Sequence, residues 1–275
     1  MTSNFDFVPQ DNGATTLKQL STGEIMHSSI GPVVEARKIY VEQSGLESKL
    51  QNGANTPLVI YDLGLGVAAN AVESIRCALN TQGRRRAHLI SFENDLGGIM
   101  TALDHLDRFS FLRDFVAPLR ALLSVGHFEC ADYRWDLVQG DFLKTTLQAF
   151  PLAEIIYHDF YTPNRFMDFW GFEVFNKLAK ASSEDCVLTT YSAATWVRSA
   201  LTLAGFHVGF GASTILKNET TVASKNPKLV SRPLDARWLE RFNCSTKGLP
   251  PDWPQEREKE ARTLVETRVH SLISL

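Results

Sequence analysis

The sequence predicts an α/β fold of Rossmann-like type, in which a mostly parallel, doubly wound sheet carries helices on its faces. Short apolar runs of strand length alternate with helix-like segments of about a dozen residues, which is typical of βαβ units. The run LVIYDL at 58–63 leads directly into a turn with two glycines, Gly64 and Gly66. Acidic residues also follow later strand-like runs, at Glu93, Asp141 and Asp159. Together these features favour a parallel sheet with a ligand site at its carboxyl edge.

Size and composition limit the class of protein. The chain has 275 residues, 44% hydrophobic and 21% charged, which suits one large globular domain with additions at its ends. The net charge of -3 shows no overall basic excess, so a nucleic-acid partner would need a local cationic patch. The four cysteines lie far apart in sequence, which predicts free thiols in a reducing compartment and no metal site. No signal peptide and no membrane span is expected, so the predicted location is cytoplasmic.

The expected elements divide the chain into three parts. Strands are expected at 58–63, 88–92, 134–138, 153–158, 186–191 and 206–210. Helices are expected at 35–46, 68–79, 96–105, 112–123, 143–150, 166–180 and 195–204. Residues 56–224 are predicted to form the main domain, with 1–55 as an extension made of a strand or arm plus a helix. Residues 225–275 are predicted to be a tail that packs on the domain and ends in a charged, solvated helix.

The glycine turn and the acids predict a cofactor that contains adenosine. Gly64 and Gly66 allow the backbone to approach a ligand closely, and a carboxylate at Glu93 suits the two ribose hydroxyls. Gly140 and Asp141 lie at the next strand end, where an acid suits the adenine amino group. A ligand with ribose and adenine but without pyrophosphate fits these positions, which favours S-adenosylmethionine. Two alternatives remain: a dinucleotide such as NAD, since alanine is tolerated at the third glycine position, or glycines that serve only the corner.

The second half of the chain carries longer motifs. The segments HDFYTPNRFMDFW at 158–170 and TYSAATWVRSALTLAGF at 190–206, with HSSIGPVVE at 27–35 upstream, resemble the MnmC-type methyltransferase family over roughly residues 20–245. The matching positions are Asp159, Phe160, Pro163, Asn164, Trp170, Thr190 to Ala194, Val197, Arg198, Ala204 to Phe206 and, upstream, His27, Ser28, Gly31 and Glu35.

The resemblance implies a class I S-adenosylmethionine-dependent methyltransferase that acts on the tRNA anticodon loop. Such enzymes methylate the exocyclic amine of 5-aminomethyl-(2-thio)uridine at the wobble position. Some members are fused to a flavin-dependent oxidase domain. At this length the chain is expected to carry the methyl transfer alone, without flavin.

Amine methylation needs a neutral nucleophile, so a carboxylate that orients the amine and takes its proton is expected at the site. Asp159 is predicted to have this role, with a turn or N-cap aspartate as the alternative. Phe160, Tyr191 and Ser192 are predicted to line the substrate side, although Tyr191 is equally compatible with the core. Trp170 is expected to be packing.

Other polar residues have two interpretations each. His27 either contacts the methionine end of the cofactor or is structural. The cluster Arg84, Arg85 and Arg86 is either a solvated loop or a phosphate contact, and Arg198 is expected at a helix surface or cap.

Two functional alternatives remain open at this point. One is a methyltransferase of a small amine or of another RNA, and the other is a non-catalytic RNA-binding module whose cofactor pocket has decayed. The sequence does not predict the oligomeric state.

Overall fold

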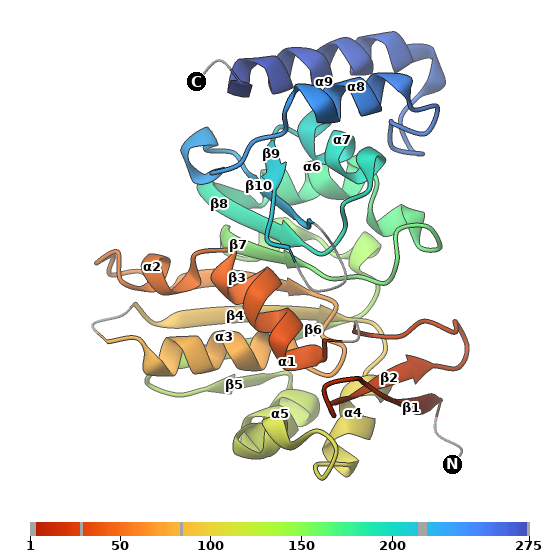
Figure 1. The fold of residues 1–275 in the computed structure, drawn as a ribbon. Coiled ribbons are helices and arrows are strands. Elements are labelled where there is room, and N and C mark those ends of the chain that lie inside the picture. The colour runs from red at the N-terminus through yellow and green to blue at the C-terminus, as the bar shows by residue number, and fades with distance from the viewer. Residues whose placement is uncertain (1–3, 28–29, 83–84, 214–218, 274–275) are drawn as a thin grey trace.

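A single sheet runs through the centre of the molecule. The computed structural model describes residues 4–27, 30–82, 85–213 and 219–273 (Figure 1). In this part of the chain the main sheet has eight strands in the order β5-β6-β4-β3-β7-β8-β10-β9. The strands are β3 Leu58–Leu63, β4 Ala87–Glu93, β5 His127–Glu129, β6 Tyr133–Gln139, β7 Ala153–His158, β8 Ser182–Thr190, β9 His207–Phe210 and β10 Thr221–Ser224.

The sheet is mostly parallel, as the sequence predicts. β6, β4, β3, β7 and β8 run in the same direction, while β5 is antiparallel to β6, and β10 is antiparallel to both β8 and β9. From β3 the chain moves outward through β4 to β6, and then returns to the other side of β3 to form β7 and β8. The strand order therefore reverses between β3 and β7, and the carboxyl ends of these strands are where such folds bind ligands.

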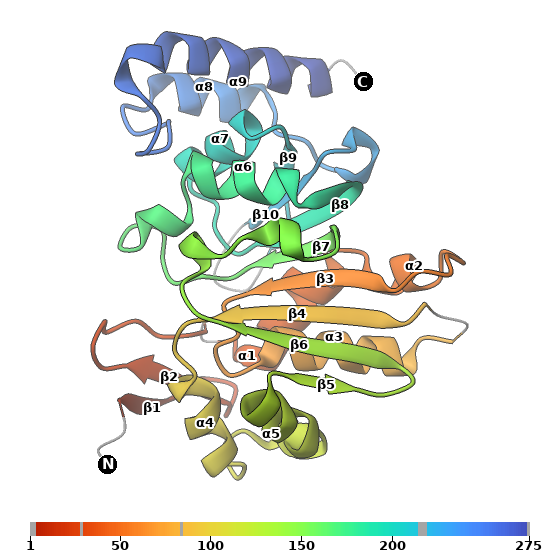
Figure 2. The same cartoon turned by 180° about the vertical axis from the view of Figure 1, so that it is seen from behind.

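Helices cover both faces of the sheet, which explains why all six residues of β3 are buried (Figures 1 and 2). One face carries α1 Pro32–Glu35, the π-helix η1 Ala36–Glu42, α2 Leu46–Leu50, α3 Ala69–Asn80, α4 Gly97–Asp104 and α5 Val116–Val125. The other face carries α6 Phe172–Lys180, α7 Thr195–Leu203, α8 Ala236–Cys244 and α9 Glu258–Ile273. Among the described residues, none of these helices has the length and apolar character that a bilayer crossing requires.

The N-terminal segment forms a hairpin that lies beside the carboxyl edge of the sheet. Its strands, β1 Phe5–Pro9 and β2 Thr15–Gln19, pair antiparallel. Gln19 Nε2 donates to Asp95 Oδ2 at 2.9 Å on the loop after β4, and Arg165 pairs with Glu24 at 3.2 Å on the loop after β7. These contacts tie the hairpin to both sides of the strand-order reversal.

Several predicted elements differ from those in the structure. Residues 143–150 form two short 3-10 turns, η3 Phe142–Lys144 and η4 Leu147–Ala149, in place of one helix. The helix expected over 166–180 is interrupted, because η5 Met167–Phe169 ends before α6 begins at Phe172. The Asp252 carboxylate accepts the N–H groups of Phe172 and Glu173, both at 2.9 Å, and so caps α6 from a distant segment.

Further elements lie outside the predicted pattern. The strands β5 and β10 were not expected, and the segment predicted as one helix over 35–46 is divided among α1, η1 and α2. The remaining 3-10 helices are η2 Ser110–Phe115, η6 Pro227–Leu229 and η7 Gln255–Arg257.

The C-terminal residues are part of the hydrophobic core. Trp238 and Phe242 of α8 and Val265 and Val269 of α9 are at most 1% exposed and pack with α6 and α7. The charged residues of α9 form a solvated face, as expected for this run, and the apolar face on the other side of the helix is buried. Its charges lie on the remaining surface, where Arg257 and Arg262 pair with Glu260 and Glu258. In the sequence of α9 the apolar residues stand singly or in pairs among charged ones, so the buried face was not predicted.

The glycine turn after β3 adopts a conformation that favours glycine. Gly64 has φ +92°, and a Cβ built on it would lie 2.7 Å from the backbone oxygen of Asp159. Gly66 has φ +56°. Ala68 has φ +64°, and it is the only non-glycine residue with positive φ in the described part of the chain. The turn therefore brings the end of β3 against the end of β7. This close approach is possible because residue 64 is a glycine and has no Cβ.

Replacing Gly64 by alanine should destabilise the protein more than the same change at Gly13. Gly13 also has a positive φ, +80°, but its Cβ position is open, so it controls for backbone strain alone. Both variants should lose about 1–2 kcal/mol for the left-handed conformation, and Gly64→Ala should lose about 1–3 kcal/mol more from the contact with Asp159. Urea unfolding measures both. Equal losses would show that the close approach is unimportant.

The buried face of α9 yields a second stability prediction. Val265→Ala should lower the free energy of unfolding by about 2 kcal/mol, because it removes two buried methyl groups from the core. Thr267→Ala is the matched control on the exposed side of the same helix, and it should change the free energy by less than about 0.5 kcal/mol. Equal, small effects for both variants in urea unfolding would contradict the packing of α9.

Candidate active site

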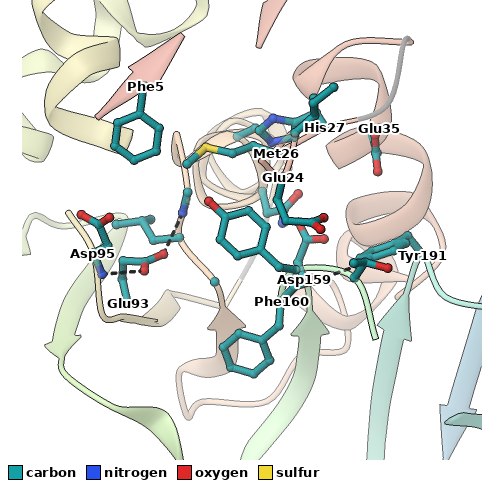
Figure 3. Close-up of a pocket in the computed structure, with 18 residues that line it drawn as sticks. Phe5, Glu24, Met26, His27, Glu35, Glu93, Asp95, Asp159, Phe160 and Tyr191 are labelled. Carbon is teal, nitrogen blue, oxygen red and sulfur yellow. Dashed lines mark hydrogen bonds between the residues drawn. The ribbon is translucent and has the colours of Figure 1, made fainter. Parts of the chain in front are cut away.

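A cavity of about 350 Å³ lies at the strand-order reversal (Figure 3). Its walls come from the ends of β3, β4, β7 and β8, from the first turn of α3, and from the segment after the N-terminal hairpin. The described lining residues are Phe5, Glu24, Ile25, Met26, His27, Glu35, Gly64, Leu65, Gly66, Ala69, Asn70, Glu93, Asp95, Asp159, Phe160, Tyr161, Thr162 and Tyr191. Its size lies within the range of small-molecule sites.

Glu93 closes one side of the cavity and holds the glycine turn. Its carboxylate accepts the N–H of Gly66 at 3.1 Å through one oxygen, and the N–H groups of Asn94 and Asp95 at 2.8 and 2.9 Å through the other. Burial raises the pKa of Glu93, and these three backbone bonds oppose the rise. A carboxylate offers about four acceptor positions, so Glu93 keeps capacity for a ligand hydroxyl.

Asp159 lies on the opposite side and is fixed through both carboxylate oxygens. Tyr40 donates its hydroxyl to Oδ1 at 2.5 Å, and Asn70 donates Nδ2 to Oδ2 at 2.8 Å. Among the described residues, its side-chain hydrogen bonds therefore come from the side chains of η1 and α3. An N-cap or turn aspartate would instead accept backbone N–H groups. The geometry favours a site residue over a turn residue.

The pKa of Asp159 lies well above its usual range. Removal from bulk water is the main cause, and the nearby charge of Glu35 adds to it, whereas the bonds from Tyr40 and Asn70 act in the opposite direction. A carboxylate with a raised pKa is a stronger base when ionised, which suits proton transfer from an amine.

The cavity is strongly acidic. Five carboxylates line it, from Glu24, Glu35, Glu93, Asp95 and Asp159, and its described lining includes no lysine or arginine. Figure 3 shows Glu93 and Asp95 on one side and Glu35, Asp159 and Tyr191 on the other, with Met26 and His27 above. Such a lining favours a ligand with positive charge.

The structure brings together six of the nine predicted site residues. Gly64, Gly66, Glu93, Asp159, Phe160 and Tyr191 line the cavity. Tyr191 donates its hydroxyl to the backbone oxygen of Phe160 at 3.0 Å, so the hydroxyl orients the loop after β7.

Gly140, Asp141 and Ser192 are not among the lining residues. The N–H of Gly140 donates to the backbone oxygen of Glu93 at 2.9 Å, which places this turn beside the cavity. The Asp141 carboxylate accepts the N–H of Leu143 at 3.0 Å and caps η3. Ser192 is buried, and its backbone oxygen accepts the hydroxyl of Thr221 at 2.6 Å.

The remaining polar candidates are resolved as follows. His27 lines the cavity, its Nδ1 lies 3.0 Å from the Thr16 hydroxyl, and burial lowers its pKa. Trp170 is fully buried and is packing, as expected. Ser28 and Arg84 lie outside the described residues.

The predictions for the arginines need correction. Arg198 was expected at a helix surface or cap, but it is 1% exposed and pairs with Glu219 at 2.9 Å. Arg85 is buried and donates to Glu154 at 2.6 Å, and Arg86 pairs with Glu129 at 2.7 Å. Both lie at the amino end of β4, opposite the cavity, so neither is available there for phosphate.

The sequence analysis missed the two residues that hold Asp159. Tyr40 lies within the helix expected at 35–46, and Asn70 within the helix expected at 68–79, and neither was predicted to be a site residue. Asn70 could have been predicted as a site residue, because it is a polar residue in the first helical turn after a glycine loop. Tyr40 comes from a π-helix, whose altered register no helical periodicity predicts.

Part of the chain is similar to known methyltransferases. Residues 110–226 match the model of a family described as S-adenosyl-L-methionine-dependent methyltransferase. Among the proteins similar to this chain are two bacterial ones named tRNA 5-methylaminomethyl-2-thiouridine biosynthesis bifunctional protein MnmC. The MnmC of Aeromonas salmonicida is 27% identical over 71% of this chain and 32% of its own length, and that of Cupriavidus metallidurans is 28% identical over 79% and 34%. The chain thus spans about a third of these relatives.

The fold has solved counterparts. The crystal structure of MnmC2 from Aquifex aeolicus superposes with a TM-score of 0.76, at 21% identity, over 99% of this chain and 86% of that one. Spermidine synthase from Thermotoga maritima gives a TM-score of 0.50 at 14% identity, over 97% and 84%. These matches show that the chain is similar to the MnmC proteins and has the fold of the class I S-adenosyl-L-methionine-dependent methyltransferases.

Proposed function

We propose that this chain methylates the exocyclic amine of 5-aminomethyl-(2-thio)uridine at the wobble position of tRNA, with S-adenosylmethionine as the methyl donor. The observation that carries the proposal is Asp159, held by Tyr40 and Asn70 at the wall of an acidic cavity next to the glycine turn. The names of the MnmC relatives support the choice of nucleoside. The proposal places the protein with tRNA in the cytoplasm.

The residues present fit S-adenosylmethionine. Gly64 and Gly66 line the cavity with backbone alone, so a ligand can approach the turn closely, and Glu93 retains acceptor capacity for ribose hydroxyls. The acidic lining matches the positive charge of a sulfonium. When bound, the cofactor supplies an electrophilic methyl group. We assign Gly140 and Asp141 to the neighbouring turn that supports Glu93 rather than to direct contact.

Asp159 performs the proton chemistry in this proposal. An alkylamine is mostly protonated near neutral pH, so the ionised carboxylate accepts one proton and leaves the nitrogen lone pair free. Tyr40 and Asn70 fix the carboxylate, which orients the amine for an in-line displacement. Glu24 and Glu35, on the same side of the cavity, stabilise the cationic amine before it loses its proton.

The three sequence regions have distinct parts in this site. We assign the cofactor turn, Asp159 and Tyr191 to the main domain at 56–224. The extension at 1–55 supplies Glu24, Met26, His27 and Glu35 to the cavity. Residues 225–275 support the opposite face of the sheet. Phe160 and Tyr191 are assigned to the substrate side, and Ser192 to support behind it.

The test combines nucleoside analysis with two variants. The purified chain should bind S-adenosylmethionine in calorimetry and methylate tRNA that carries the 5-aminomethyl group, detected by mass spectrometry of digested nucleosides. Asp159→Asn should lower kcat by at least about 100-fold with unchanged cofactor affinity. Glu93→Gln should instead raise the cofactor Kd about tenfold, as lost charge-assisted bonds predict.

Other outcomes favour the alternatives. Methylation of free alkylamines at rates equal to tRNA would favour a small-amine enzyme. Absence of cofactor binding would favour a non-catalytic RNA-binding module. Normal turnover in Asp159→Asn would exclude Asp159 as the proton acceptor.

The pH dependence follows from the groups that face Asp159. Activity requires the ionised carboxylate, so the acid limb of the kcat profile reports its pKa. Tyr40→Phe removes a bond that lowers this pKa, so the acid limb should move to higher pH, whereas Glu35→Gln removes a charge that raises it, so the limb should move to lower pH. Each displacement should be about one pH unit.

Tyr61→Phe is the matched control for these profiles. The Tyr61 hydroxyl donates to the backbone oxygen of Pro151 at 2.8 Å, on the other face of the sheet. It should leave the acid limb in place. Displacement of the limb in the same direction by Tyr40→Phe and Glu35→Gln would contradict the assignment of the limb to Asp159.

A further inference from the structure

A second hollow lies beside β9, which is the outermost strand at the other end of the sheet from β5. It has a volume of about 800 Å³ and lies between the end of β9 and the outer side of α8, whose places are labelled in Figure 1. Three arginines line it: Arg232, which follows the edge of β9, and Arg237 and Arg241, one turn apart on α8. We call this hollow the arginine groove. None of the functions considered above accounts for it.

The three arginines of the groove form no ion pair with any acid in the described part of the chain. All three are exposed, and no carboxylate oxygen of the described residues lies within ion-pair distance of their guanidinium groups. Elsewhere the chain pairs many of its arginines, as at Arg85 and Arg86. Unpaired guanidinium groups in a concave surface are the usual contacts for phosphate.

The acids in the groove are mostly engaged elsewhere. Glu219 accepts Nη1 of the buried Arg198 at 2.9 Å. The Asp235 carboxylate accepts the N–H of Trp238 at 2.8 Å and caps α8. With Glu219 paired to Arg198, the charges of Asp235 and Glu240 stand against three arginines, a difference of one charge. The groove therefore has a positive excess.

Like charges also accumulate beneath the groove. Burial lowers the pKa of Arg198, Glu219 opposes this, and the charge of Arg241 lowers it further. The guanidinium of Arg198 lies 4.9 Å from the centre of the Phe210 ring, and that of Arg232 lies 6.0 Å from it. An anion in the groove would reduce the repulsion among these groups.

Like the cavity, the groove lies near the carboxyl ends of the parallel strands. Phe210 pairs with Thr221, and Thr221 pairs with Thr190, directly before the cavity residue Tyr191. Two strand spacings separate Phe210 from Thr190, which is about 10 Å. A nucleotide in the cavity and a phosphate in the groove can thus belong to one RNA molecule.

The cavity itself is unsuited to the RNA backbone. Its five carboxylates attract the amine but repel phosphates, and the net charge of the chain is -3. Affinity for RNA depends mainly on phosphate contacts, so a cationic surface away from the cavity is required. Arg85 and Arg86 do not supply it, because they pair with acids at the opposite end of β4.

We propose that the arginine groove binds the phosphate backbone of the RNA whose base enters the cavity, through Arg232, Arg237 and Arg241. The inference rests on the proposed function, since it takes the substrate to be an RNA. The contacts to backbone position the RNA, while recognition of the base remains in the cavity.

The test measures the salt dependence of RNA binding. The probe is an unmodified tRNA transcript with uridine at the wobble position, titrated by fluorescence anisotropy at several NaCl concentrations. Arg237→Ala with Arg241→Ala should reduce the slope of log Kd against log salt by about 1.4–1.8, the value for two lost phosphate contacts. At moderate salt the Kd should rise about tenfold.

Two controls separate the groove from general effects. Arg120→Ala removes an exposed arginine of α5, on the opposite side of the molecule near β5, and it should leave the slope unchanged. Arg237→Lys with Arg241→Lys keeps both charges and should retain most of the slope. Cofactor affinity should be unchanged in every variant, which also reports a folded site.

The outcomes distinguish this inference from the proposed function. If the wild-type chain methylates tRNA but the double alanine variant keeps the wild-type slope and Kd, the groove does not bind the backbone. If the slope falls equally with Arg120→Ala, the effect is one of net charge and the inference is overturned. If the wild-type chain binds no transcript and modifies no tRNA, the proposed function itself fails.

Discussion

The close approach of two strand ends is the constraint on which the site depends. The backbone at Gly64 lies against that of Asp159, so close that a Cβ at Gly64 would come within 2.7 Å of the Asp159 oxygen. This contact joins the cofactor turn after β3 to the acid after β7, and Tyr40 and Asn70 then fix the acid from the covering helices. The glycine requirement, the orientation of the acid and the position of the cavity are thus one structural feature.

Much of the fold could be predicted because parallel strands buried on both faces give continuous apolar runs. The runs at 58–63 and 153–158 correspond residue for residue to β3 and β7. The site residues at the ends of β3, β4 and β7, which are Gly64, Glu93 and Asp159, follow from the rule that ligands bind at the carboxyl edge. The resemblance to the MnmC family supplied the substrate class, which no single-residue pattern contains.

The remainder depends on contacts between distant segments. The start of α6 is set by Asp252, 80 residues away from Phe172 along the chain. Arg198 is buried because Glu219, just before β10, pairs with its guanidinium. Tyr40 reaches Asp159 from a π-helix, and the apolar face of α9 is hidden among charged residues. Asp141 and Ser192 were placed by analogy with strand ends, but their polar groups are engaged in a cap and in the support of β10. Local sequence patterns carry no information about these pairings.

The excess of carboxylates in the cavity has a consequence for turnover. Methyl transfer converts a charged sulfonium to a neutral thioether, so the spent donor loses the attraction that five acids exert on its precursor. In the proposed reaction this positive charge would pass to the methylated amine, while Asp159 holds the proton that the amine gave up before the transfer. The wall that captures fresh cofactor therefore holds the by-product less tightly, and electrostatics favours exchange of one for the other after each cycle. The same lining that attracts the charged donor thereby promotes release of the neutral thioether.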